Sequence, residues 1–304
     1  MSVSVFIDGA AGTTGLEIRE RLAKRDDLRL IVVDEARRKD AAARAEALND
    51  ADVAILCLPD DAAREAVALI ASDTKVIDAS SAHRVADGWT YGFPELEFDV
   101  ASAARVSNPG CYPTGFLALV APLVRAGLVP ADWPLTVNAV SGYSGGGKAL
   151  IERVEDDPTL AFRAYGFDLG HKHAPEMQLY AGLAYPPVFA PSVARAFRGM
   201  VVEVPLALFA LPGRASRAAL LDALHRQFEG KPLVRVHDDM PGESLLDAAA
   251  APTDRLDLYV ATDARETQAR LVATLDNLGK GAGGAAVQNL NLLAGLDPLA
   301  GLIL

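Results

Sequence analysis

Cysteine, basic charge and long apolar runs are all scarce in this chain of 304 residues, and each scarcity excludes a class of protein. Its two cysteines, Cys57 and Cys111, are too few for the disulfide framework of a small secreted protein. A net charge of -11 argues against a nucleic-acid partner, which requires a basic face. No apolar stretch approaches the ~18 residues that cross a bilayer, and the first strand begins without a signal-peptide pattern. We therefore expect a cytoplasmic protein with no membrane contact.

The hydrophobic fraction of 51% and the chain length predict a large core and two domains. In the first half, apolar runs at 3–7, 28–33, 53–58 and 75–79 alternate with helical patterns, which predicts a parallel sheet of βαβ units. From about residue 135, strand-like runs have few crossover helices between them, which predicts a largely antiparallel or mixed α+β domain. Those runs are 135–140, 200–208, 233–236, 256–262 and 268–275; helices are predicted at 216–228 and 285–299.

A glycine-rich turn, Gly9-Ala10-Ala11-Gly12-Thr13-Thr14-Gly15, joins the first predicted strand to a helix over 16–24. Glycines at such a turn let the backbone approach a pyrophosphate, which the helix N-terminus binds through its N–H groups. Gly9, Gly12 and Gly15 are therefore candidate dinucleotide-binding residues. Ala10 occupies the place of the first glycine in the standard fingerprint, so a plain strand-to-helix loop is the alternative.

The second predicted strand ends in charged residues that bear on the choice of cofactor. Asp34 lies near the position at which a carboxylate binds the ribose 2′-OH of NAD, whereas Arg37, Arg38 and Lys39 suit the 2′-phosphate of NADP. Three cations outweigh one carboxylate, so NADP is the predicted cofactor. A solvated charged loop is the alternative.

The octet Ser107-Asn108-Pro109-Gly110-Cys111-Tyr112-Pro113-Thr114 contains the candidate nucleophile. An Asn-Pro-Gly turn precedes Cys111 and a helical pattern follows it, which places the thiol near a helix N-terminus. The N–H groups and the helix dipole there favour the thiolate, which is the nucleophilic form. A buried, unreactive cysteine is the alternative.

Two polar loops are candidates for anion binding. Arg84 lies in the segment that follows the strand at 75–79, where an anion clamp and a surface arginine are both consistent with the sequence. The second loop, residues 141–148, combines three consecutive glycines with Lys148 at the end of a predicted strand. Glycines expose backbone N–H groups, and Lys148 adds positive charge; a flexible loop with one solvated lysine is the alternative.

The segment Gly170-His171-Lys172-His173-Ala174-Pro175-Glu176 holds two of the five histidines. A histidine near Cys111 serves as acid or base, and Glu176 orients the ring of His173 if the segment is helical. The spacing does not say which histidine transfers the proton. Metal binding and a pair of exposed histidines are the alternatives, although no third ligand recurs at a recognisable spacing, so no metal is predicted.

These motifs, together with the tail Gly284-Ala285-Ala286-Val287-Gln288-Asn289-Leu290-Asn291, resemble the N-acetyl-gamma-glutamyl-phosphate reductase family in its shorter sequence class. The resemblance spans the chain with the motifs in the same order. It implies an α/β fold with a Rossmann domain, residues 1–110 plus 285–304, and an α+β catalytic and dimerisation domain of the glyceraldehyde-3-phosphate dehydrogenase type, residues 111–284. The broad sheet of the second domain suits a subunit interface, so we expect a homo-oligomer, either a dimer or a tetramer.

The resemblance further implies roles for individual residues. Cys111 would be the nucleophile, and His171, His173 and Glu176 would provide acid–base chemistry. Gly12, Thr13, Thr14 and Gly15 would bind the NADP pyrophosphate, while Gln288 or Asn289 would approach the nicotinamide. Substrate would contact Asn108, Ser141, Gly142, Arg84 and Lys148. The implied reaction is NADPH-dependent reduction of an acyl phosphate, N-acetyl-L-glutamyl 5-phosphate, through a cysteine thioester in arginine biosynthesis.

Other functions remain open from the sequence. A related acyl phosphate, such as aspartyl phosphate, would use the same chemistry. A cysteine hydrolase or acyltransferase would use Cys111 and histidine without a nicotinamide, and a dinucleotide sensor would not use the thiol at all.

Overall fold

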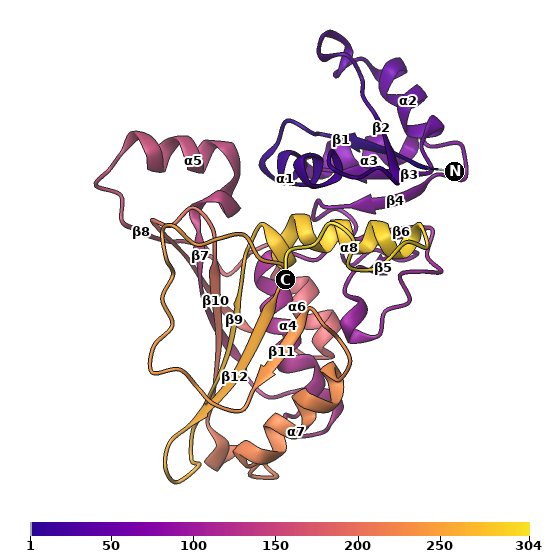
Figure 1. The fold of residues 1–304 in the computed structure, drawn as a ribbon. Helices are drawn as coiled ribbons and strands as arrows, with labels where there is room; N and C mark the ends of the chain where they lie inside the picture. The colour runs from indigo at the N-terminus through magenta and orange to yellow at the C-terminus, as the bar shows by residue number, and fades with distance from the viewer. Residues whose placement is uncertain (1) are drawn as a thin grey trace. The chain divides into compact units, whose positions relative to one another are not determined.

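The computed structural model describes residues 2–304, which form two compact units (Figure 1). The first unit comprises the chain up to Gly110 together with Ala282–Ile303, and the second comprises Cys111–Gly281. Among the described residues, no helix is both long and apolar enough to cross a membrane.

The first unit contains a six-stranded sheet with the order β2-β1-β3-β4-β6-β5, and every neighbouring pair is parallel. Its strands are β1 (Val3–Asp8), β2 (Leu28–Ile31), β3 (Val53–Leu56), β4 (Lys75–Asp78), β5 (Thr90–Tyr91) and β6 (Arg105–Ser107). Strand order that runs outward in both directions from β1 and β3 is the doubly wound pattern, in which ligands bind beyond the carboxyl ends of the strands. The predicted Rossmann-type sheet is confirmed.

Helices cover both faces of this sheet. Ile18 of α1 (Thr13–Leu22) and Leu290 of α8 (Gly284–Leu293) share one core cluster with the strands. Leu48 of α2 (Ala41–Asp50) and Ala63 of α3 (Asp60–Ala68) belong to the cluster on the opposite face. Helix α8, yellow in Figure 1, therefore brings the C-terminal end of the chain into the first unit.

The second unit contains a seven-stranded sheet with the order β11-β12-β13-β10-β7-β9-β8. The pairs β7/β9 and β11/β12 are parallel and the remaining pairs antiparallel, so the predicted mixed sheet is confirmed. Its strands are β7 (Thr136–Gly142), β8 (Phe162–Ala164), β9 (Val188–Ala194), β10 (Met200–Leu206), β11 (Val234–His237), β12 (Leu256–Thr262) and β13 (Ala269–Leu275).

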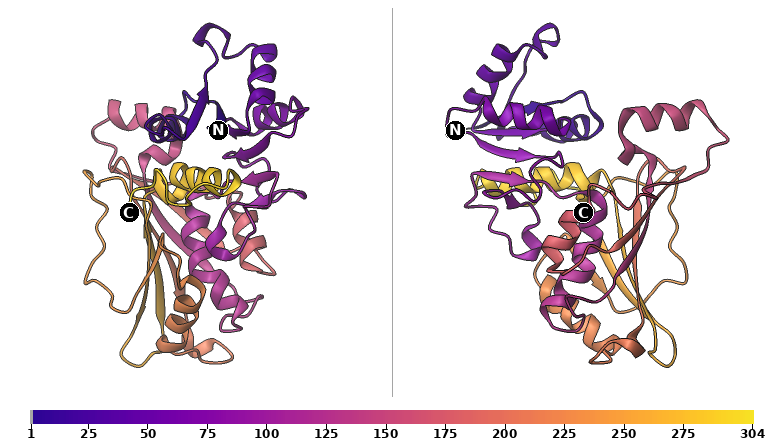
Figure 2. Two further views of the ribbon diagram at one scale, coloured as in Figure 1. Left: turned by 45° about the vertical axis from the view of Figure 1, so that its right-hand side comes forward. Right: turned by 180° about the vertical axis from the view of Figure 1, so that it is seen from behind.

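Three helices lie on one side of this sheet, as both views of Figure 2 show: α4 (Cys111–Arg125), α6 (Ala174–Ala181) and α7 (Arg217–Phe228). Helix α4 packs closely on β10, because a Cβ at Gly115 would lie 2.8 Å from Cγ2 of Val202. A smaller apolar cluster joins α5 (Gly147–Asp156) to Val193 of β9.

The strands β5, β8 and β9 and the helices α2 and α5 were not predicted from the sequence. Strand β9 contains Pro191 and follows two further prolines, and proline normally argues against a strand. It pairs with β7 in parallel and β8 in antiparallel, so Pro191 is accommodated in the interior of the sheet.

Candidate active site

The glycine turn has the shape that a pyrophosphate requires. Gly9 has a φ of 88°, and a Cβ there would lie 2.3 Å from the carbonyl oxygen of Cys57. A Cβ at Gly15 would lie 2.5 Å from the carbonyl oxygen of Gly9. Helix α1 begins at Thr13, and its N-cap residue, Gly12, provides no side-chain cap. The N–H groups of this helix start therefore suit an anionic ligand.

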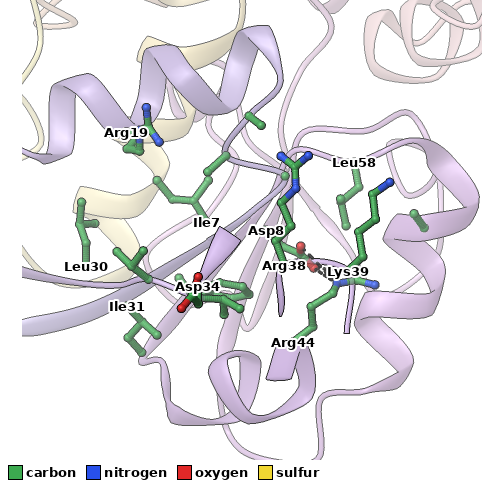
Figure 3. A pocket seen from close by; sticks show the side chains of 17 residues that line it. Ile7, Asp8, Arg19, Leu30, Ile31, Asp34, Arg38, Lys39, Arg44 and Leu58 are labelled. Atoms are coloured by element: carbon green, nitrogen blue, oxygen red, sulfur yellow. Dashed lines mark hydrogen bonds and ion pairs between the residues drawn. The ribbon is translucent and has the colours of Figure 1, made fainter. Parts of the chain in front are cut away.

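A cavity of about 610 Å³ opens beside this turn, at the carboxyl ends of β1 and β2 (Figure 3). Apolar side chains, including Leu30, Val33 and Leu58, form part of its wall. Four cationic side chains also line it: Arg19, Arg38, Lys39 and Arg44. An apolar wall with clustered positive charge suits an adenosine that carries phosphate groups.

Figure 3 shows the side chains of Arg38 and Lys39 extending into the cavity above the pair formed by Asp8 and Arg44. Arg44 forms an ion pair with Asp8 at 2.8 Å, and both side chains are largely buried. Asp34 also lines the cavity, but its carboxylate accepts the N–H of Ala36 and thereby caps a short 3₁₀ turn.

In the charged loop, residues 34–39, some side chains line the cavity and others face solvent. Arg37 does not line the cavity; it is exposed and lies 3.8 Å from Asp40. Arg44 and Arg19 were not predicted from the sequence, because each lies on a helix and reaches the cavity only through the packing of that helix on the sheet.

The two predicted nicotinamide residues lie on α8 and are held within the first unit. Nε2 of Gln288 donates to the buried carboxylate of Glu95 at 2.9 Å. Nδ2 of Asn289 donates to the carbonyl oxygen of Gly92 at 3.1 Å and to Oδ1 of Asn108 at 3.0 Å. Oδ1 of Asn289 is buried without a hydrogen-bond partner among residues 2–304.

The structure confirms that Cys111 lies at a helix N-terminus, because it is the first residue of α4. Gly281 packs directly against it, since a Cβ at Gly281 would lie 3.0 Å from Cβ of Cys111. The backbone N–H groups of the first turn of α4 favour an anionic sulfur.

An aromatic cluster brings both predicted histidines to the ring of Tyr112, the residue that follows Cys111. The ring of Tyr112 lies 6.2 Å from that of His171 and 5.8 Å from that of His173, and the two imidazoles are 4.7 Å apart. Tyr165 lies 5.6 Å from His171 and donates its hydroxyl to that of Tyr112 at 3.3 Å. Tyr112 in turn donates to the carbonyl oxygen of Ser192 at 2.9 Å.

The two tyrosines are held in their neutral forms. Burial raises the pKa of the Tyr112 hydroxyl well above its usual range, and the nearby Tyr165 and Cys111 add to the shift. Burial also raises the pKa of Tyr165, with a further contribution from Cys111. Both hydroxyls are therefore hydrogen-bond groups beside the thiol rather than bases.

The two histidines differ in their hydrogen bonding. The backbone N–H of His173 donates to Nδ1 of His171 at 3.1 Å, so the proton of a neutral His171 ring resides on Nε2. His173 is the N-cap residue of α6, and Glu176 lies in the first turn of this helix. Because this segment is helical, as the prediction required, Glu176 lies one turn from His173.

The glycine loop after β7 is arranged differently from an open anion nest. The N–H groups of Gly142, Tyr143 and Ser144 donate to the carbonyl oxygens of Gly199, Ala196 and Phe197, respectively. The hydroxyl of Ser141 is buried and donates to the carbonyl oxygen of Gly142, while Lys148 is exposed on α5. The backbone of this loop is thus largely engaged within the protein.

Arg84 is also engaged within the protein. Its side chain is buried, with Nε donating to the carbonyl oxygen of Asn108 at 3.1 Å and Nη2 to that of Ala79 at 3.3 Å. Over residues 2–304, no group of three histidine, cysteine, aspartate or glutamate side chains is arranged to hold a metal ion.

Two family models match this chain, and several solved structures share its fold. Residues 4–104 match the family model for the semialdehyde dehydrogenase NAD-binding domain, and residues 111–277 match the semialdehyde dehydrogenase dimerisation domain. Solved structures with the same fold include a probable aspartate-semialdehyde dehydrogenase from Pseudomonas aeruginosa (TM-score 0.73, 18% identity, 97% of this chain and 99% of that chain). The aspartate semialdehyde dehydrogenase II of Vibrio cholerae is similar (TM-score 0.69, 17% identity, 97% and 99%). Fold and site define a nicotinamide-dependent oxidoreductase of the semialdehyde dehydrogenase class.

Curated relatives narrow this class. The chain is 48% identical over 317 residues to the N-acetyl-gamma-glutamyl-phosphate reductase of Trichormus variabilis, covering 98% of each chain. It is 50% identical to N-acetyl-gamma-glutamyl-phosphate reductase 2 of Pseudomonas putida, covering 96% of each, and 50% identical to the reductase of Brucella ovis, covering 97% and 100%. The chain belongs to the N-acetyl-gamma-glutamyl-phosphate reductase family.

Proposed function

We propose that the chain reduces N-acetyl-L-glutamyl 5-phosphate to N-acetyl-L-glutamate 5-semialdehyde and phosphate with NADPH, as a step of arginine biosynthesis. The observation that carries the proposal is the placement of Cys111 as the first residue of α4, next to the cluster of Tyr112, His171 and His173. This cluster occurs in a chain about half identical to reductases of that name.

The chemistry begins at Cys111. Its thiolate attacks the carbonyl carbon of the acyl phosphate, a C–S bond forms, and the bond between that carbon and the phosphate oxygen breaks. Phosphate leaves, and the N–H groups at the start of α4 stabilise the transient oxyanion. Reduction of the thioester carbonyl requires a hydride, which a nicotinamide would supply when bound. A histidine protonates the oxygen and recovers that proton as the C–S bond breaks, which releases the aldehyde and restores the thiolate.

We assign the proton transfer to His173. Nδ1 of His171 already accepts a hydrogen bond from the backbone N–H of His173. A proton added to Nδ1 would therefore point at that N–H group, which is itself a donor. The Nε2–H group of His171 can therefore donate a hydrogen bond, but the His171 ring is poorly suited to accept a proton. His173 lies next to Tyr112 and one helical turn from Glu176, which gives it the position of the acid–base group.

We also propose NADP(H) as the cofactor. Arg38, Lys39 and Arg44 line the cavity in the first unit, and a phosphate on the ribose 2′-oxygen would interact favourably with them. The carboxylate of Asp34, which would favour NAD, caps its own turn. The glycine turn and the start of α1, with Thr13 and Thr14, would hold the pyrophosphate.

The two units would then have different roles. The first would bind the dinucleotide, and the second would carry Cys111 and associate with a second copy into a homo-oligomer. Support for association comes from the match to a dimerisation domain and from the sheet face opposite α4, where Asn138 and Ala190 are exposed. We place this oligomer in the cytoplasm.

The experiment runs the reaction backwards. Purified protein receives NADP, phosphate and N-acetylglutamate γ-semialdehyde, and NADPH formation is followed with and without phosphate. We expect phosphate-dependent NADPH formation that is lost in Cys111→Ser and kept in the matched control Cys57→Ser. Equal or faster turnover of aspartate semialdehyde would identify the related acyl phosphate instead. Turnover retained by Cys111→Ser would contradict the thioester route, and ester hydrolysis without NADP binding would indicate a cysteine hydrolase.

A further inference from the structure

Asn108, three residues before Cys111, has all of its polar groups engaged by the protein. Its side chain is 1% exposed. Its backbone N–H donates to the carbonyl oxygen of Asp78 at 2.7 Å, and its carbonyl oxygen accepts Nε of Arg84 at 3.1 Å. Its Nδ2 donates to the carbonyl oxygen of Ala282 at 3.0 Å, and its Oδ1 accepts Nδ2 of Asn289 at 3.0 Å.

These four bonds join segments that are far apart in the sequence. Asp78 ends β4, Arg84 lies in the loop after it, Ala282 precedes α8, and Asn289 lies within α8. Only Pro109 and Gly110 separate Asn108 from the thiol residue. One asparagine therefore ties the turn that leads into Cys111 to the end of a strand, to its following loop and to a helix.

The partner Asn289 is itself fixed in one orientation. Its Nδ2 faces two acceptors, the carbonyl oxygen of Gly92 and Oδ1 of Asn108, so a flipped amide would place its oxygen against both. A Cβ at Gly92 would lie 2.3 Å from Nδ2 of Asn289, so no larger residue fits beside this amide. The bond to Asn108 consequently helps to fix the direction in which Oδ1 of Asn289 points.

We propose that Asn108 is a positioning residue, which holds the turn at residues 108–110, directly before Cys111, against the Asn289 amide on α8. The proposal assigns Asn108 to the protein scaffold rather than to substrate, because both its amide groups are already used. Arg84 supports the same turn through the carbonyl oxygen of Asn108. The inference rests on the proposed role of Cys111 and deepens it.

Iodoacetamide alkylation of Cys111 tests the proposal without any acyl phosphate. Alkylation is followed by peptide mass spectrometry across pH in the full chain, for wild type, Asn108→Ala, Asn108→Asp and Asn289→Ala. The matched control is Asn291→Ala, because Asn291 is equally buried on α8 but bonds Arg25 and the carbonyl oxygen of Ala300. Melting temperatures of all variants are measured alongside.

We expect Asn108→Ala to slow Cys111 alkylation and turnover by about 10- to 100-fold, because small displacements of a reacting group have effects of this size. We also expect its pH profile to move to higher pH, since a looser turn aligns the sulfur less well with the start of α4. Asn291→Ala should lower the melting temperature while its alkylation profile stays that of wild type.

Asn108→Asp keeps the acceptor for Asn289 but turns a carboxylate oxygen toward the carbonyl oxygen of Ala282, so its alkylation rate should fall at least as far as that of Asn108→Ala. Asn289→Ala removes the donor to Oδ1 of Asn108 and leaves the bond of Asn108 to Ala282, so its alkylation rate should fall between wild type and Asn108→Ala. This variant also gives a result if Asn108→Ala does not fold. A wild-type rate and pH profile in a folded Asn108 variant would overturn the proposal. So would an equal shift in Asn291→Ala, which would indicate a general loss of stability. Failure of the reductase assay with these alkylation differences intact would count against the proposed substrate and not against the positioning role.

Discussion

The backbone N–H of His173 donates a hydrogen bond to Nδ1 of His171, at 3.1 Å. This bond makes two neighbouring histidines chemically unequal, because one ring nitrogen of His171 is committed as an acceptor. Sequence spacing alone left the two residues equivalent.

His173→Asn and His171→Asn should therefore differ in activity. Loss of a general acid–base group lowers turnover by about 100- to 10,000-fold, which we expect for His173→Asn. In His171→Asn the side-chain oxygen replaces Nδ1 as acceptor for the backbone N–H, so we expect a loss below about tenfold. The loss of turnover in each variant is measured as steady-state kcat and its pH dependence. The opposite ranking would assign proton transfer to His171.

The two cysteines should differ in their response to alkaline pH. Burial raises the pKa of the Cys57 thiol to about 12, and the carboxylates of Asp78 and Asp8 add to this shift. Iodoacetamide at pH 8 should therefore label Cys111 and leave Cys57 unmodified in the folded protein. Labelling of Cys57 at a rate comparable with that of Cys111 would contradict the burial argument.

The same shift makes stability depend on pH. The pKa of this thiol is raised from its usual value of 9.0 to about 12 in the folded chain. The unfolded state therefore loses its proton first, and the stability contribution of Cys57 is complete below pH 9 and is lost as the pH rises toward 12. Urea unfolding between pH 8 and pH 11 should show a smaller decline for Cys57→Ala than for wild type. Parallel declines would show that other groups, such as the buried tyrosines, account for the whole effect.

The fold was largely predictable because its signals are local. Alternating apolar runs and helical patterns indicated both sheets, and the Asn-Pro-Gly turn correctly indicated the helix start at Cys111. Tyr165 escaped prediction because it reaches Tyr112 only through the pairing of β8 with β9. The bonding of Asn108 was equally hidden, since Asn289 lies at the other end of the chain. Contacts that depend on long-range packing leave no periodic pattern in the sequence.

The cationic side of the cavity should select NADPH over NADH. Lys39→Met and Arg38→Met each remove a charge that lines the cavity, whereas Arg37→Met removes one that does not and serves as the matched control. A charge-assisted hydrogen bond contributes about 1.5–3 kcal/mol, so KM for NADPH should rise about tenfold or more in each of the first two variants. KM for NADH should change little. An equal rise in KM for NADPH in Arg37→Met, or an equal rise in KM for NADH in the first two variants, would contradict the assignment of NADP(H) as the cofactor.

Gly9 should tolerate no side chain, in contrast to Gly88. Both have positive φ, 88° and 79°, so alanine at either position incurs a backbone strain of about 1–2 kcal/mol. At Gly88 no heavy atom lies within 4 Å of the new Cβ, so strain is the whole cost. At Gly9 the Cβ would lie 2.3 Å from the carbonyl oxygen of Cys57, which is rigid backbone in the segment after β3. The turn must shift to relieve this contact, and the shift moves the N–H groups that would bind a pyrophosphate.

We therefore expect Gly88→Ala to lower the free energy of unfolding by about 1–2 kcal/mol while leaving NADPH affinity within about twofold of wild type. Gly9→Ala should lose more stability and most of its NADPH affinity. Urea titrations and NADPH fluorescence on the same preparations separate the two effects. If Gly9→Ala bound NADPH as tightly as Gly88→Ala, the pyrophosphate would not lie at this turn, because a displaced backbone cannot keep the same contacts with its ligand.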